Sequence, residues 1–162
     1  MIISLKNKDT LVIDKFYLKC CIGKNGVNNK KREGDFTTPK GTFNLNKLYF
    51  RKDRLGKVKC KIPKRFITKS MAWCDDSNHK KYNKEIHIST KYHKECLFRS
   101  DHKYDYLIST SHNQKGIPNK GSAIFIHLTN NYKPTAGCIA LKKKDFEIVL
   151  KLIDKKTKIK ID

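Results

Sequence analysis

Residues 121–141, GSAIFIHLTNNYKPTAGCIAL, carry both a strong strand pattern and a candidate reactive pair. Within them, AIFIHL at residues 123–128 is apolar on both faces, which is typical of a central strand in a sheet. His127 lies near the end of this strand, and a turn-rich loop then leads to Gly137 and Cys138. We therefore predict a buried strand and a loop that folds back to bring Cys138 near His127.

Strand patterns also dominate the rest of the chain. They occur at residues 2–5, 11–18, 43–48, 104–110 and 157–161, whereas residues 51–70 are basic and irregular and predict a surface excursion. One helix is clear, because its apolar residues follow the spacing i, i+3, i+4 and i+7, with Asp145 as the expected N-cap: Phe146, Val149, Leu150 and Ile153. We predict a mostly-β fold, a β-sandwich or mixed sheets, with this amphipathic helix in the C-terminal half and short surface helices. Residues 1–162 are expected to form one domain and a monomer.

The chain is strongly basic, with 37 Lys and Arg against 15 Asp and Glu and a formal net charge of +22. Such a field attracts anionic polymers, and a nucleic-acid-binding module is one reading. However, the lysines are spread along the chain and only five residues are arginine, the side chain that specific base and phosphate recognition uses most. We therefore expect a generally basic surface and no nucleic-acid partner.

The N-terminal residues do not resemble a signal peptide, and no apolar run is long enough for a membrane span. The cellular compartment stays open. The six cysteines include no C-x-x-C pair, and the histidines lack a paired ligand spacing, so neither a metal nor a cofactor is expected.

A thiol is a useful nucleophile only as thiolate, so Cys138 needs a base such as His127, eleven residues upstream. Gly137 lets the backbone approach a substrate closely, and the N–H groups of Gly137 and Cys138 can together form an oxyanion hole. The alternative is that both side chains belong to an ordinary core.

These residues resemble the YkuD-type L,D-transpeptidase catalytic domain. Its signature has a strand ending in His, a variable loop and then Ser/Thr-His-Gly-Cys, and the matching positions here are His127, Thr135, Gly137, Cys138 and Ile139. Residues 38–43, TPKGTF, which include Thr38 and Gly41, are similar to the T-P-x-G-x-F segment of the family. Further similar segments lie at residues 31–35, 73–76, 104–105 and 121–125.

The resemblance implies acyl transfer on peptidoglycan stem peptides, with Cys138 as nucleophile and His127 as base, and with either a cross-linked or a hydrolysed product. It also implies that the carbonyl of Leu128 orients His127, that Thr38, Gly41 and Thr135 help to form the site, and that the protein works in the cell envelope. Ala136 replaces the second His of the common signature, and Ala140 stands where Arg or Asn is frequent. A catalytically inactive relative that binds wall peptides is therefore an alternative.

Overall fold

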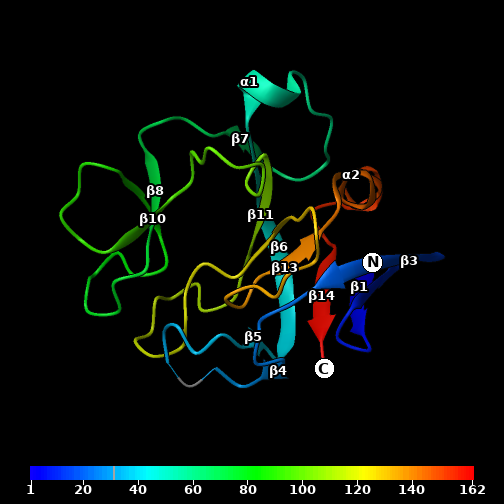
Figure 1. The fold of residues 1–162 in the computed structure, drawn as a ribbon, viewed down its shortest axis with the longest axis horizontal. Helices are drawn as coiled ribbons and strands as arrows, with labels where there is room; N and C mark the ends of the chain where they lie inside the picture. Colours follow the sequence, from blue (N-terminus) through cyan, green and yellow to red (C-terminus); the bar gives the residue numbers. More distant parts are fainter. Residues whose placement is uncertain (31) are drawn as a thin grey trace.

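In the computed structural model, which describes residues 1–30 and 32–162, eight strands, most of them labelled in Figure 1, form a closed ring. In order around the ring, its strands are β11 (Tyr106–Thr110), β12 (Phe125–Leu128), β13 (Ile139–Leu141), β3 (Phe16–Cys21), β2 (Thr10–Ile13), β1 (Ile2–Lys6), β14 (Lys158–Ile161) and β6 (Gly41–Phe50). The ring closes because the long strand β6 pairs with β14 along residues 41–44 and with β11 along residues 45–50. The prediction of a mostly-β fold is confirmed.

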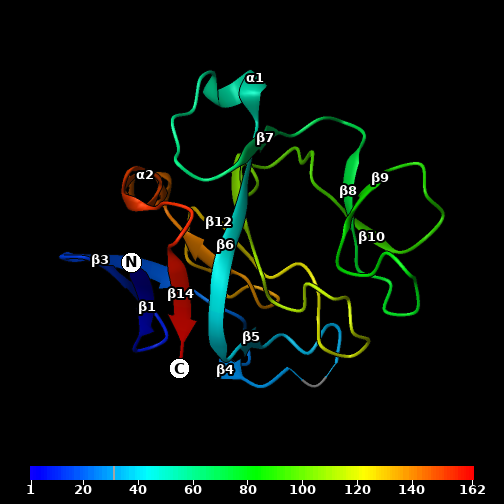
Figure 2. The ribbon, with the colours of Figure 1, turned by 180° about the vertical axis from the view of Figure 1, so that it is seen from behind.

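A second, smaller sheet stands to one side of the ring (Figure 2). It contains β8 (Met71–Cys74), flanked by β9 (Glu85–His87) and β10 (Lys94–Cys96). The basic excursion expected at residues 51–70 carries the short helix α1 (Lys52–Leu55) and strand β7 (Lys64–Phe66), which pairs with the end of β6. A short parallel pair, β4 (Val27–Asn28) and β5 (Thr38–Pro39), lies below the ring in Figure 1.

The prediction of one strand across residues 11–18 is wrong. The chain turns at Asp14, whose φ of 52° is left-handed, and so divides the segment into β2 and β3. Asp tolerates this conformation, but its neighbours are apolar on both sides of the turn, which makes the segment look continuous.

The predicted C-terminal helix is present as α2 (Lys143–Leu152). Phe146, Val149 and Leu150 are buried as expected, and the Phe146 ring stacks on Tyr106. The predicted cap is wrong, because the helix begins before Asp145 and this residue lies in its first turn. There its charge still interacts favourably with the helix dipole. No helix in residues 1–30 and 32–162 is long and apolar enough to cross a membrane.

Two hydrophobic cores explain why residues 123–128 are apolar on both faces. Ile126 and Leu128 point into the ring, where they join the cluster that includes Phe146 of α2. Phe125 points outward and packs with Leu107 and Leu97 under the smaller sheet. Because side chains alternate along a strand, His127 also faces outward, toward the space between the ring and the smaller sheet.

Candidate active site

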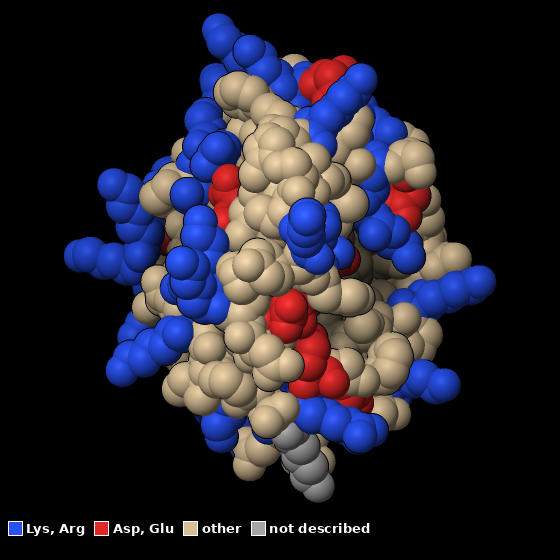
Figure 3. All heavy atoms as spheres, turned by 90° about the vertical axis from the view of Figure 1, so that its left-hand side faces the viewer, with Lys and Arg blue, Asp and Glu red and all other residues tan. Residues whose placement is uncertain are grey.

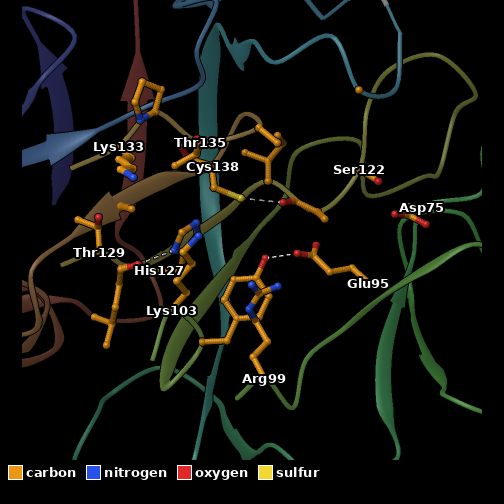
Figure 4. Close-up of a pocket in the computed structure, with 18 of the residues that line it drawn as sticks. Asp75, Glu95, Arg99, Lys103, Ser122, His127, Thr129, Lys133, Thr135 and Cys138 are labelled. Carbon is orange, nitrogen blue, oxygen red and sulfur yellow. Dashed lines mark hydrogen bonds between the residues drawn. The ribbon is translucent and has the colours of Figure 1, made fainter. Parts of the chain in front are cut away.

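Pairing between β12 and β13 brings the predicted nucleophile and base to one face of the sheet. The strands run parallel with His127 opposite Ala140, and Cys138 lies two residues before Ala140 on the same face. Both His127 and Cys138 line a cavity of about 800 Å³ between the ring and the smaller sheet (Figure 4). The fold therefore places the predicted pair in one pocket.

A tight turn before β13 holds Cys138 in place. Gly137 has φ of 144°, and a Cβ atom there would lie 2.7 Å from the carbonyl oxygen of Thr37. The Thr135 hydroxyl accepts a hydrogen bond from Gly137 N–H (3.1 Å) and donates one to the Cys138 carbonyl (2.6 Å). Glycine is required here by both backbone conformation and space. In this state the Gly137 N–H, a predicted oxyanion donor, is bonded to Thr135.

Thr38 supports this turn from behind. Its fully buried hydroxyl accepts a hydrogen bond from Gly23 N–H and donates one to the Gly137 carbonyl, each at 2.8 Å. One side chain thus ties β5 to the turn that presents Cys138, although 99 residues separate the two partners of the second bond.

Replacing Thr38 with valine should destabilise the fold by about 2–4 kcal/mol, because it leaves a buried N–H and a buried carbonyl without their partner. Urea unfolding measures this change. The matched control is Thr42→Val on an exposed position of β6, which should change the free energy of unfolding by less than about 0.5 kcal/mol. Equal stability of the two variants would show that the Thr38 bridge is dispensable.

His127 is 6% exposed, and its environment selects one tautomer. Nδ1 lies 2.9 Å from the Leu128 carbonyl oxygen, which can only accept, so Nδ1 carries the hydrogen and Nε2 keeps its lone pair. The Tyr104 ring packs edge-on against the imidazole, with centroids 5.3 Å apart. Burial lowers the pKa of His127 to about 4, despite the opposing effect of the Leu128 hydrogen bond. The imidazole is therefore neutral at neutral pH and can accept a proton at Nε2.

Cys138 is a neutral thiol in this state. Its Sγ donates to the Ala123 carbonyl at 3.0 Å, and the Phe125 N–H approaches the sulfur at 3.4 Å. Burial raises the pKa of the thiol to about 12, and the charge of Glu95 raises it further. The resting pair is thus thiol and imidazole, not thiolate and imidazolium.

The structure brings together most of the residues that the sequence analysis selected. His127, Leu128, Thr135 and Cys138 line the cavity, while Thr38 and Gly137 lie directly behind it. Gly41 is the exception. It is the first residue of β6, where it pairs with Ile161 of β14, and it does not line the cavity. Its φ of 142° and the contact that a Cβ would make with Phe43 explain the glycine structurally.

The two alanines that depart from the common signature also line the cavity. Ala136 is exposed at the turn, whereas Ala140 is fully buried between His127 on β12 and Cys21 on β3. The small side chain of Ala140 therefore leaves open the part of the wall next to the imidazole.

Sequence reasoning missed two polar pairs at the site. The Tyr104 hydroxyl donates to Glu95 of β10, which places a carboxylate in the cavity. Lys30, with a side chain only 3% exposed, lies over Gly121 and pairs with Asp35 at 2.5 Å. The partners are only five and nine residues apart in the sequence, but no motif marks them, and their place at the cavity depends on segments that meet only in the folded chain. The similar segment at residues 31–35 begins at Lys31, which lies outside the described residues.

Trp73, the single tryptophan, packs edge-on against Phe125 with ring centroids 5.0 Å apart and so connects the smaller sheet to the ring. Among the described residues, no group of three or more His, Cys, Asp or Glu side chains is arranged to hold a metal ion.

Comparison with known families gives one match over nearly the whole chain. The YkuD family, the L,D-transpeptidase catalytic domain, matches residues 2–161. The chain belongs to this family.

Solved structures give the same fold for this YkuD domain. The helical cell shape determining protein Pgp2 from Campylobacter jejuni, and a point mutant of it, each match with a TM-score of 0.55 and 17% identity. The match covers 99% of this chain and 46% of Pgp2, so the chain spans less than half the length of that protein. The comparison with curated proteins gives no match.

Proposed function

We propose that the chain catalyses cysteine-dependent acyl transfer on peptidoglycan stem peptides. The observation that carries the proposal is the placement of Cys138 and a neutral His127, with Nδ1 bonded to the Leu128 carbonyl, on one wall of one cavity. This arrangement supplies a nucleophile, a base of defined tautomer and space for a peptide.

In the first step, Cys138 Sγ attacks the carbonyl of the diamino-acid residue in a stem tetrapeptide, at the bond to the terminal D-amino acid. The thiol proton moves to His127 Nε2 as the C–S bond forms. The imidazolium then gives that proton to the nitrogen of the terminal D-amino acid as the peptide bond breaks. The products are a thioester on Cys138 and a free D-amino acid.

In the second step, an amine or a water molecule attacks the thioester. His127 takes a proton from the attacking group, and the thiol is restored. An amine gives a cross-link and water gives a shortened stem peptide, so the acceptor alone separates transpeptidase from carboxypeptidase activity.

The negative oxygen formed in both steps needs hydrogen-bond donors. The Cys138 N–H and the Gly137 N–H are the proposed donors, as the last turn before β13 carries both. The Gly137 N–H serves this role once it exchanges the Thr135 hydroxyl for the substrate oxygen.

Incubation of the purified chain with a stem tetrapeptide tests the proposal. We expect release of the terminal D-amino acid, detected by chromatography, together with a transient acyl adduct detected by intact-protein mass spectrometry. An inactive wall-peptide-binding relative would bind the peptide and release nothing, which would contradict the proposed function.

A further inference from the structure

The cavity that contains Cys138 has an acidic wall. Glu33, Asp75 and Glu95 all line it, in a chain with only 15 acidic residues against 37 basic ones. Figure 3 shows acidic atoms gathered in a streak beside a hollow, on a face that also carries many Lys and Arg side chains. In Figure 4, Asp75 and Glu95 lie on the far side of Cys138 from Lys133. A convergence of acids in such a basic protein needs a physical explanation.

These carboxylates have few cationic partners. Glu33 accepts a hydrogen bond from Tyr82, Glu95 accepts one from Tyr104, and Asp75 contacts the ring of His93 at 2.5 Å. Among residues 1–30 and 32–162, no Lys or Arg forms an ion pair with any of the three. Burial raises the pKa of Glu95. The Tyr104 hydrogen bond and the charge of Arg99 oppose this rise, whereas the charges of Asp75 and Glu33 add to it.

Three of the five Lys and Arg residues that line the same cavity are bonded to other groups. Lys30 binds Asp35 and the Thr37 carbonyl, and Arg99 forms two hydrogen bonds with Asp101. Lys94 donates to the carbonyls of Thr90 and Tyr92. The other two, Lys103 and Lys133, lie on the His127 side of the cavity in Figure 4, away from Asp75. Within the part of the chain that the structure describes, the acidic wall is therefore not paired with a Lys or Arg, although the charge of Arg99 acts on Glu95.

A buried hydroxyl adds a second, independent sign of a ligand site. Ser122 is 5% exposed and lines the cavity, and its Oγ makes no hydrogen bond of normal geometry. Its nearest polar neighbour is the Tyr82 hydroxyl: Ser122 lowers the pKa of that phenol by pointing its hydrogen toward the phenol oxygen, while Tyr82 donates to Glu33, so the lone pairs of Ser122 Oγ stay open to a donor. Buried hydroxyls usually have a partner, so this one is suited to a group that enters the pocket.

We propose that Glu33, Asp75, Glu95 and Ser122 form a subsite for a primary ammonium group of the substrate. An ammonium has three donors and no acceptor, which matches a wall of carboxylate and hydroxyl oxygens. The identification of the ligand rests on the proposed function: in the acyl donor, the group is the side-chain ammonium of the diamino-acid residue whose carbonyl Cys138 attacks. Its charge also offsets that of Glu95, which is one of the causes that raise the pKa of the Cys138 thiol.

The test is a binding measurement in the Cys138→Ala variant, which prevents turnover. Isothermal titration calorimetry compares a stem tetrapeptide that has a free side-chain amine with the same peptide acetylated on that amine. The free-amine peptide should bind about tenfold more tightly, with a stronger dependence on salt concentration. Adding Asp75→Asn should reduce this ratio toward one.

Asp76→Asn is the matched control, because it removes the same charge one residue away. Asp76 is absent from the cavity lining and accepts a hydrogen bond from the Asn78 N–H. It should leave the ratio unchanged. A second variant, Glu95→Gln, should act like Asp75→Asn, with Glu85→Gln as its control outside this cavity.

Equal binding of the two peptides, or an equal effect of Asp75→Asn and Asp76→Asn, would overturn the subsite. Acyl transfer by the wild-type chain would still stand in that case, because release of the D-amino acid is measured separately. Absence of binding by both peptides, together with absence of release, would overturn both proposals.

Discussion

Replacement of Cys138 with alanine should abolish the acyl adduct and reduce release of the D-amino acid by a factor on the order of 10³ or more. The reason is specific to this atom: Sγ lies in the cavity, next to the strand that carries His127, and alanine keeps the small buried volume but removes the nucleophile. Intact-protein mass spectrometry after mixing with a stem peptide or a carbapenem measures the adduct.

Cys21 provides a sharp control for this prediction. It is 7% exposed on β3, directly opposite Ala140, and so lies on the same face of the sheet as Cys138. Cys21→Ala should retain the adduct, as should Cys96→Ala at an exposed position. An adduct that survives in Cys138→Ala, or that disappears in Cys21→Ala, would assign the nucleophile to another residue.

Replacement of His127 with glutamine should slow acylation by a factor of about 10²–10⁴, the usual contribution of a general base. The effect is smaller than the loss of the nucleophile because the thiol remains and can still react as the small thiolate fraction set by its high pKa. Single-turnover acylation followed by mass spectrometry separates the two outcomes: a slow adduct in His127→Gln and none in Cys138→Ala.

The same substitution should change how stability depends on pH. The pKa of His127 is about 4 in the folded chain, whereas an unfolded histidine titrates near 6.5, so the unfolded state binds the proton first as the pH falls. The neutral buried imidazole therefore leaves the free energy of unfolding undiminished above pH of about 6.5. As the pH falls from there toward about 4, the free energy of unfolding decreases progressively. Between pH 7 and pH 5, urea unfolding should show a loss of about 2 kcal/mol from this residue. The loss should be missing in His127→Gln, and identical pH profiles would show that the buried imidazole is not the cause.

The candidate site was predictable from the sequence where its features depend on residues that are neighbours in the chain. The His127 strand is recognisable because six successive residues can be buried. The Cys138 turn is recognisable because Pro134 fixes its own φ and Gly137 permits a backbone conformation that other residues avoid. The geometry agrees with these patterns, since both residues reach one cavity. Gly41 shows the limit of a motif: it belongs to the similar segment at residues 38–43, yet its φ of 142° serves β6 and not the cavity.

Turns inside apolar stretches were less predictable. Asp14 reverses the chain between β2 and β3, although the residues on both sides are equally suited to one continuous strand. In the folded chain, β3 also pairs with β13, where Cys21 lies opposite Ala140. This pairing favours β3 as a separate strand, and it joins segments more than one hundred residues apart. Local propensity cannot contain that information.

The sequence by itself determined the mostly-β class, the buried His127 strand and helix α2, and it selected Cys138 and His127 as the candidate nucleophile and base. Each of these depends on hydrophobic period or residue chemistry over a short window, which the linear order preserves. Tertiary structure alone decided the closure of the ring through β6, the Thr38 bridge to Gly137 and the acidic wall of Glu33, Asp75 and Glu95. The physical reason is that strand register and loop closure bring distant residues together, and the charge of a pocket exists only after they meet.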